Sequence, residues 1–439
     1  MRQMKDSGIA WVGEIPQDWR ITKVKYCFSN VKEIVGGKVD NYERLSLTMN
    51  GVVKRSKEDN IGLQPDKFET YQILRPNELV FKLIDLQNVS TSRVGLSPYL
   101  GIVSPAYIIL KCNNNIYPQF AEKYFLMMWK NHIFNAFGDA GVRSSLSSVD
   151  LLELPIVLPP FDEQQQIAEF IEKKCVEIDE LIFLYEQQIE KLKEYNKSII
   201  TEAVTKGVNN LTSKLDGNGG GYELSHNIFA VPMKDSGIVW LGDTPVDWRL
   251  VPLYCLYSER KNINSLGKEN NLLSLSYGKI IRKDVNSNEG LLPTNYNGYN
   301  IIEKNDIVIR PTDLQNDKRS LRTGLVKERG IITSAYIALK PKHGTNSKYY
   351  HYLLRSYDLE KVFYNMGNGV RQSLNYDEFS KLMVLVPPKA MQQIIVDYLD
   401  KKCTEIEQII ADKNTQLDTL DDYKKSLIYE YVTGKREAA

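Results

Sequence analysis

The six residues Met4–Ile9 read M-K-D-S-G-I, and the same six letters return at Met233–Ile238, where the second copy begins 229 residues after the first. Both copies continue through the pattern W-x-G-x-x-P-x-D-W-R and end at Arg20 and Arg249. A repeat this long exceeds the period of solenoid arrays. It indicates two similar domains in tandem.

The repeat keeps its register along the whole chain. Three shorter matches share an offset of 228 residues: D-L-Q-N at Asp85–Asn88 and Asp313–Asn316, G-V-R at Gly141–Arg143 and Gly369–Arg371, and K-K-C at Lys173–Cys175 and Lys401–Cys403. This constant spacing predicts that the two halves share one fold.

The first part of each half has a mixed pattern. Within 1–160, short β-type runs such as Glu78–Ile84 and Gly101–Lys111 are separated by turns, and Asn50-Gly51 predicts a hairpin turn. The run Gln119–Phe137 has helical spacing, and a strand at 154–158 ends at a Pro-Pro pair. We expect mixed α/β domains at 1–160 and, by the repeat, at 229–388.

Each of these parts is followed by a long helical pattern. Residues 162–206 contain neither Gly nor Pro, and their apolar residues recur at steps of three and four. Residues 161–206 and 389–436 are therefore predicted to form two long helices that pair as an antiparallel coiled coil, which gives an α+β chain with a pseudo-two-fold. A surface helix folded back on its own domain is the alternative. Residues 207–228, rich in Gly, Asn and Ser, predict a flexible linker.

Composition narrows the class of protein. The 56 Lys+Arg and 55 Asp+Glu leave a net charge of +1, and no apolar run has the length of a membrane span. The N-terminus lacks the apolar stretch of a signal peptide, and the five scattered cysteines suggest neither disulfides nor a zinc site. We expect a cytoplasmic chain that does not bind membranes.

The near-neutral total hides a segregation of charge. Residues 1–160 carry a net +3 and residues 229–388 a net +6, whereas 161–206 carry −5 and 389–436 carry −1. Basic globular parts favour a polyanionic partner such as nucleic acid, although many domains of this charge bind none.

Catalytic motifs are missing from the sequence. It has no G-x-x-x-x-G-K-[ST] phosphate loop, no H-E-x-x-H and no Gly-rich turn for a methyl-donor cofactor, and its Pro-Pro pairs lack the Asn or Asp that DNA adenine methyltransferases place before them. One set of residues, Asp247 with Glu259 and Lys261, has a pattern typical of metal-dependent nucleases, an acidic residue followed by E-x-K. Val31 matches Glu259 in the first half, which argues for solvated charge instead.

Taken together, these marks resemble the specificity subunit of type I restriction-modification enzymes over nearly the whole chain. Besides the duplicated opening, they include L-P-P-x-x-E-Q-Q-Q-I-A at Leu158–Ala168 and Y-x-x-S-L-I-x-E-x-V-T-G at Tyr423–Gly434. The second helix entry, from Lys389 to Gln393, departs from the pattern because it lacks the Glu.

The resemblance implies that each globular domain is a target-recognition domain for one half of a bipartite, interrupted DNA site. It also implies that the paired helices set the distance between the two domains and dock two modification subunits, and that a restriction subunit joins. The chain itself would hold no cofactor, because methyl donor, ATP and Mg would bind the partner subunits.

The halves differ most across 37–75 and 263–302, so these stretches are the first candidates for base readout. The candidates for DNA contact are Lys54, Arg55, Gln87, Asn88, Arg143, Arg282, Lys283, Gln315, Asn316 and Arg371. The basic pairs Lys54-Arg55 and Arg282-Lys283 follow hairpin turns, although exposed basic pairs on turns are more often idle. The amides suit adenine edges, but the shared D-L-Q-N sequence fits a structural loop equally well. The two G-V-R arginines suit phosphates or loop anchors.

Five tyrosines, Tyr296, Tyr299, Tyr349, Tyr350 and Tyr352, suit base stacking, but for the three on a predicted helix a core role is favoured. We therefore expect a non-catalytic DNA-recognition and scaffold subunit. The alternatives are a chain with its own nuclease activity and a coiled-coil interaction protein that ignores DNA.

Overall fold

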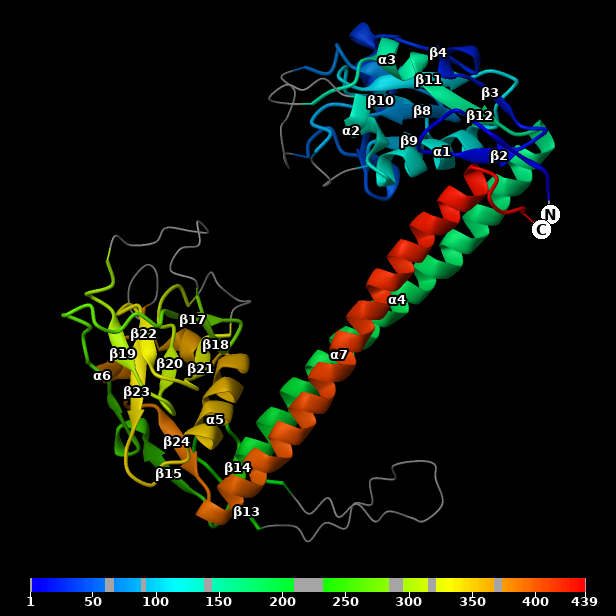
Figure 1. Ribbon diagram of the computed structural model, residues 1–439. Coiled ribbons are helices and arrows are strands. Elements are labelled where there is room, and N and C mark those ends of the chain that lie inside the picture. The colour runs from blue at the N-terminus through cyan, green and yellow to red at the C-terminus, as the bar shows by residue number, and fades with distance from the viewer. Residues whose placement is uncertain are drawn as a thin grey trace, which may run out of the picture. The chain divides into compact units, whose positions relative to one another are not determined.

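The computed structural model describes residues 2–59, 67–87, 92–137, 144–208, 232–283, 295–314, 321–366 and 373–438. The chain divides into two compact units, of which unit 1 combines Met1–Glu186 with Asn414–Ala439 and unit 2 is Gln187–Lys413. Each unit holds one globular domain and one end of each long helix (Figure 1). None of the described helices combines the length and the apolar character that a bilayer crossing requires.

The domain of unit 1 is built on two four-stranded sheets, with strand orders β4-β11-β8-β9 and β6-β5-β10-β7, and has two further strand pairs, β1-β2 and β3-β12. Its strands are β1 (Met4–Asp6), β2 (Glu14–Pro16), β3 (Arg20–Lys23), β4 (Phe28–Asn30), β5 (Glu43–Thr48), β6 (Gly51–Arg55), β7 (Gln72–Leu74), β8 (Glu78–Phe81), β9 (Val94–Leu96), β10 (Gly101–Val103), β11 (Ile108–Cys112) and β12 (Pro155–Leu158). Its helices are α1 (Pro118–Lys130), α2 (Ile133–Phe137), α3 (Ser148–Glu153) and the 3-10 turns Val24–Tyr26 and Gly36–Asn41.

The domain of unit 2 repeats this plan. The sheet β16-β23-β20-β21 corresponds to β4-β11-β8-β9, and the hairpin β17-β18 corresponds to β5-β6. Its strands are β13 (Met233–Asp235), β14 (Asp243–Pro245), β15 (Arg249–Pro252), β16 (Tyr257–Glu259), β17 (Leu273–Ser276), β18 (Lys279–Arg282), β19 (Asn300–Ile302), β20 (Ile307–Ile309), β21 (Thr323–Leu325), β22 (Gly330–Ile332), β23 (Ile337–Pro341) and β24 (Met383–Val386). Its helices are α5 (Ser347–Leu359), α6 (Tyr376–Phe379) and the 3-10 turns Leu253–Cys255 and Val362–Asn365.

Two local predictions need correction. The helix expected over 119–137 breaks after Lys130, because His132 adopts a left-handed backbone conformation (φ 57°) that an α-helix cannot continue through, and α2 begins afresh at Ile133. The single run expected over 101–111 is two strands, β10 and β11, separated by a turn in which the Tyr107 amide donates to the Ser104 carbonyl. The hairpin predicted at Asn50-Gly51 is confirmed as β5-β6, with Gly51 at φ 85°.

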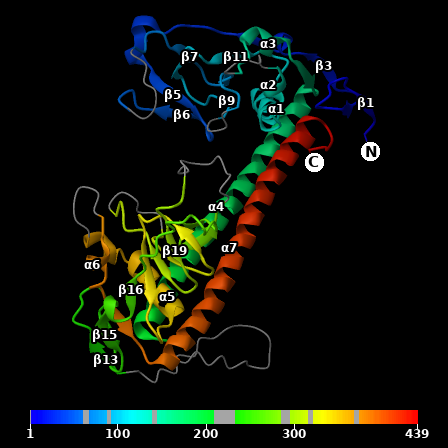
Figure 2. The same cartoon turned by 60° about the vertical axis from the view of Figure 1, so that its left-hand side comes forward.

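The two long helices are α4 (Phe161–Lys206) and α7 (Lys389–Val432), and within each unit they lie side by side in both cartoon views (Figures 1 and 2). In unit 1, Phe170 stacks on Tyr431 and the Lys424 ammonium lies 2.6 Å from the Asp179 carboxylate. Residue numbers rise on α4 as they fall on α7, so the pairing is antiparallel. The predicted stripe residues Ile167, Ile171, Cys175, Ile178 and Ile189 are buried, which confirms the coiled-coil interpretation over a surface helix.

The last turn of each long helix packs into the globular domain of the other repeat. Thus α7, from the second repeat, packs into the domain of unit 1, and α4, from the first repeat, packs into the domain of unit 2. Val432 of α7 shares the apolar core of unit 1 with Trp19, and Val204 of α4 shares the core of unit 2 with Trp248. A glycine follows each helix in a left-handed conformation, and a Cβ on Gly434 would lie 3.0 Å from the Trp19 ring. In each domain, the tryptophan at the end of the duplicated opening motif therefore packs against the C-terminal end of a long helix.

The helix entries explain why the second copy of the entry motif lacks its Glu. In unit 1, Glu163 accepts a hydrogen bond from the buried Trp19 indole (3.0 Å) and pairs with Arg2. Met391 takes the place of Glu163 in unit 2, where its sulfur lies near Gly207 beside Trp248. The carboxylate is thus replaced by an apolar contact at this position.

Candidate nucleic-acid interface

The basic pair of the first domain lies on β6, on the hairpin that the sequence predicted. The Lys54 ammonium lies 2.7 Å from Glu43 and 5.2 Å from the centre of the Tyr99 ring, and Arg55 pairs with Asp59 at 2.7 Å. These hydrogen-bonded carboxylates raise the pKa of both cations, so both are charged at neutral pH. The Lys54–Glu43 pair is solvent-exposed and adds little net stability, so a phosphate can replace this carboxylate at low cost, whereas the Arg55–Asp59 pair is partly buried.

An open pocket of about 580 Å³ adjoins this hairpin and is lined by residues 40–44 and 54–58. Four of its side chains are cationic (Arg44, Lys54, Arg55 and Lys57) and three are acidic (Asp40, Glu43 and Glu58). Arg44 is buried and stacks over Phe68, which fixes one wall of the pocket. The pocket lies within the variable stretch 37–75.

The basic pair of the second domain occupies the equivalent hairpin, at the end of β18. The Arg282 side chain is 70% exposed, its Nε donates to Glu328 at 2.7 Å, and Lys283 is exposed just beyond the strand. The hairpin is anchored at its other end, because Arg355 of α5 donates to the Gly278 carbonyl at 2.6 Å and Lys279 pairs with Glu407 of α7. The same element thus presents basic side chains in both domains.

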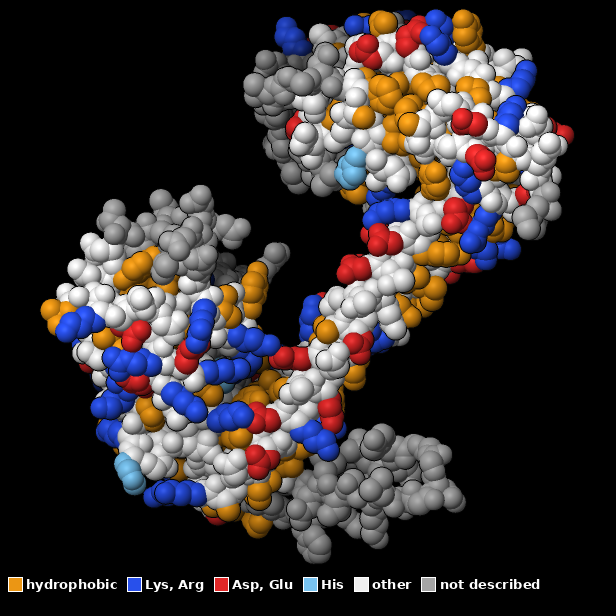
Figure 3. All heavy atoms as spheres, viewed as in Figure 1, with side chains coloured by type: hydrophobic (Ala, Val, Ile, Leu, Met, Phe, Trp, Pro, Cys, Tyr) orange, Lys and Arg blue, Asp and Glu red, His pale blue; other side chains and the backbone are white. Residues whose placement is uncertain are grey.

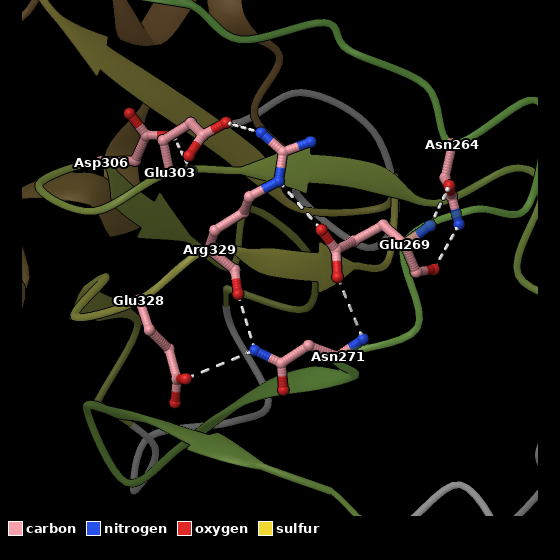
Figure 4. A network of polar contacts seen from close by, with 7 residues as sticks. All are labelled: Asn264, Glu269, Asn271, Glu303, Asp306, Glu328 and Arg329. Atoms are coloured by element: carbon pink, nitrogen blue, oxygen red, sulfur yellow. Dashed lines mark hydrogen bonds and ion pairs between the residues drawn. The ribbon is translucent and has the colours of Figure 1, made fainter.

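A polar network connects the variable stretch of the second domain to the edge of β22 (Figure 4). The Arg329 guanidinium reaches Glu269 at 2.9 Å and also pairs with Glu303, while Asn271 donates to the Arg329 carbonyl at 2.6 Å. Hydrogen bonds from Arg329 and Arg282 lower the pKa of the Glu269 and Glu328 carboxyls respectively. Sequence reasoning missed this network because its members are far apart in the chain and follow no motif.

Figure 3 shows Lys and Arg side chains spread over the visible face of the second domain, with Asp and Glu among them. This agrees with the net +6 of residues 229–388. The charge is a broad field with no single cluster on this face, which suits sequence-independent attraction of a polyanion.

The D-L-Q-N loops are structural over their first residues. Asp85 and Asp313 adopt φ of 55° and 59°, and the leucine after each is buried. Gln87 is the exposed residue that follows in the first domain. Asn88, Gln315 and Asn316 lie outside the described residues.

Arg143 and Arg371 also lie outside the described residues, but their neighbours in the chain are placed. In the first domain the Leu86 amide donates to the Ser144 carbonyl (3.1 Å) and the Leu146 amide donates to the Leu83 carbonyl (2.9 Å). In the second, the Leu374 amide donates to the Pro311 carbonyl at 3.0 Å. The base of the D-L-Q-N loop therefore meets the chain that leaves the G-V-R turn in both domains.

The tyrosines of α5 are core residues, as the sequence favoured. Tyr349 and Tyr350 are fully buried, and Tyr352 is nearly so. The Tyr349 hydroxyl donates to the Val204 carbonyl (3.1 Å) and the Tyr352 hydroxyl to Asp400 (2.9 Å), so they fasten α5 to the long helices. Tyr296 and Tyr299 pack edge to face near the surface.

The suggested nuclease residues do not form a metal cradle among the described side chains. Glu259 pairs with Lys261 at 2.8 Å, and no group of three His, Cys, Asp or Glu side chains in the described part of the chain is placed to hold a metal ion. The match of Glu259 to Val31 was wrong by one residue. Glu259 faces Leu339 in the ladder as Asn30 faces Leu110, so Asn30 is its counterpart.

The family model described as the type I restriction modification DNA specificity domain matches residues 24–194 and 267–419, well over half of the chain. A Methanocaldococcus jannaschii protein assigned as the type I restriction enzyme MjaX specificity subunit is 23% identical over 457 residues, covering 97% of this chain and 95% of that protein.

Two solved structures share the fold. A chain from a study of complex assembly and conformational transition of the type I R-M system has a TM-score of 0.67 at 12% identity, covering 96% of this chain and 99% of that one. The HsdS subunit from Thermoanaerobacter tengcongensis has a TM-score of 0.50 at 14% identity, with coverage of 96% and 98%.

Proposed function

The chain belongs to the specificity-subunit family of type I restriction-modification enzymes, and on that premise we propose that it is the non-catalytic subunit that recognises a bipartite, interrupted DNA site. One observation carries the proposal: two domains of one plan present equivalent hairpins, β5-β6 and β17-β18, whose basic side chains differ. Two domains of the same fold that carry different side chains on equivalent hairpins suit two half-sites of different sequence on duplex DNA.

We further propose that the paired helices dock two modification subunits and that a restriction subunit joins them. Part of α4 in unit 1 supports docking, since Val176, Phe183 and Leu184 are 48%, 58% and 48% exposed and recur at helical spacing. The corresponding positions of α7 are Thr404, Ala411 and Asp412, so this apolar surface supports one of the two proposed docking sites. Phe183→Glu should abolish the complex with a modification subunit and leave duplex binding unchanged.

On this proposal, the methyl donor, ATP and Mg bind the partner subunits. The cytoplasmic location expected from the sequence stays a prediction. The nuclease alternative has its own test, which is metal-dependent cleavage of a plasmid by the purified chain. Cleavage that is abolished by Glu259→Ala would overturn the non-catalytic assignment.

The direct test co-expresses the chain with a modification subunit in a host without DNA methylation and maps the modified bases by sequencing. Methyladenine confined to one motif of two parts separated by an unread spacer is the expected result. A stable complex of the two subunits that leaves the DNA unmethylated would contradict DNA recognition by this chain.

A further inference from the structure

The turns that follow β9 and β21 share one backbone arrangement. They comprise residues 97–100 in the first domain and 326–329 in the second, so both are four residues long. In each domain the first residue of the turn makes two backbone hydrogen bonds of 2.8–2.9 Å with the chain that enters the adjacent strand: Ser97 with Asn77 and Glu78, and Val326 with Asn305 and Asp306. The two turns are therefore equivalent, residue for residue.

A glycine ends each turn because the next strand passes close to the basic hairpin. A Cβ on Gly101 would lie 2.5 Å from the Glu43 carbonyl oxygen, and one on Gly330 would lie 2.5 Å from that of Asn271. Strand β10 pairs with β5 at this point, and Ile331 of β22 forms the equivalent bridge just before β17. Each turn therefore lies directly beside the hairpin β5-β6 or β17-β18.

The exposed side chains of the two turns differ in chemistry. The first domain carries Tyr99 and Leu100, which are 37% and 51% exposed. The same positions of the second domain are Glu328 and Arg329, whose side chains are 39% and 54% exposed (Figure 4). Because the second domain builds the same turn with a charged pair, the fold does not require an apolar pair here. The exposed Tyr-Leu pair therefore points to a binding partner.

Each turn contacts the basic side chain of the neighbouring hairpin. The Lys54 ammonium lies 5.2 Å from the centre of the Tyr99 ring, and Arg282 donates to Glu328 at 2.7 Å. Lys54 and Arg282 are equivalent residues, because each faces the corresponding leucine across its hairpin. Duplex DNA presents phosphates along the edge of a groove and thymine methyl groups on its floor, so a cation beside an apolar pair matches both.

We infer that Tyr99 and Leu100 are specificity-determining residues that contact the methyl group of a thymine in the half-site of the first domain. The inference rests on the proposed function. An apolar side chain distinguishes thymine in the major groove by its C5 methyl group, which the other three bases lack. The second domain carries a charged pair at these positions, so the contact belongs to one half-site. Both turns lie outside 37–75 and 263–302, so the readout surface extends beyond these variable stretches.

The test first maps the methylated motif of the complex with a modification subunit and then measures binding of that complex to a duplex carrying the motif. Each thymine of the motif is replaced in turn by uracil, which removes only the methyl group. At one position, uracil should weaken binding of the wild-type complex roughly 4-fold, the effect expected for one lost methyl contact.

Two variants should bind the thymine and uracil duplexes equally at that position, because the contact is already lost. Leu100→Ala only shortens an exposed side chain, and its salt slope should match that of the wild type because it removes no phosphate contact. Tyr99→Glu combined with Leu100→Arg installs the pair that the second domain carries on the same backbone. Val149→Ala, at a 69% exposed residue of α3, is the matched control and should keep the 4-fold difference.

Equal binding of thymine and uracil duplexes by the wild-type complex at every position would overturn the inference alone. A thymine–uracil difference that persists at full size in both variants would also overturn it. Loss of the modification subunit from both variants would overturn it as well, since the pair would then contact a protein. A wild-type complex that methylates no two-part motif would instead refute the proposed function, and the inference with it.

Discussion

Replacing Gly434 by alanine is expected to destabilise unit 1 strongly, because two separate costs meet at this residue. Gly434 has φ 71°, where an L side chain costs about 1–2 kcal/mol, and about 0.4–1 kcal/mol of this is regained from the lower entropy of the unfolded chain. The new Cβ would also press on Pro16 and lie 3.0 Å from the buried Trp19 ring. Overpacking of this kind adds about 1–3 kcal/mol, for a total of about 2–4 kcal/mol.

The matched control is Gly8→Ala in the same unit. Gly8 has φ 64°, and the Cβ of an alanine there would have no atom within 4 Å, so only the backbone cost applies, about 0.5–1 kcal/mol. The assay is urea unfolding followed by tryptophan fluorescence, with the free energy of unfolding compared between the two variants. Equal destabilisation by both substitutions would refute the idea that the end of α7 is seated on the opening motif.

Three more predictions follow from the described contacts. Glu163→Ala should lower the free energy of unfolding of unit 1 by about 1–3 kcal/mol, since the buried Trp19 indole loses its acceptor; urea unfolding measures this, and no change would mean that the bond contributes nothing. Burial and the charge of Arg355 lower the pKa of His351 to about 3 from an ordinary value of 6.5, so below pH 6.5 the unfolded chain binds a proton that the folded chain refuses. As the pH falls below 6.5, the free energy of unfolding of unit 2 should therefore decrease by at most about 1.4 kcal/mol per pH unit. His351→Gln should remove this contribution to the slope, whereas His343→Gln, at an exposed histidine, should not. Lys54→Ala combined with Arg55→Ala should reduce the salt slope of duplex binding by up to about two phosphate contacts, and an unchanged slope would place the DNA elsewhere.

Much of the fold could be predicted because local signals and long-range packing agree. The Asn50-Gly51 turn marked a real hairpin, and the apolar stripe of 162–206 marked the face that α4 buries against α7. The break at His132 could not be predicted, because it depends on a left-handed conformation that no residue type in that run demands.

The candidate site was less predictable for a physical reason. Lys54 and Arg282 stood out as basic residues after turns, and the structure places them on equivalent hairpins. The polar network around Arg329 was missed, because its partners Glu269 and Glu303 lie far from it in the chain and follow no motif.

The central claim is that each domain reads its own half of the DNA site. The measurement that tests it most directly replaces the variable stretch 37–75 with that of another family member and maps methylated bases in the complex with a modification subunit. The account predicts that one half of the recognised motif changes while the other half and the spacer length stay the same. A change in both halves, or in neither, would contradict it.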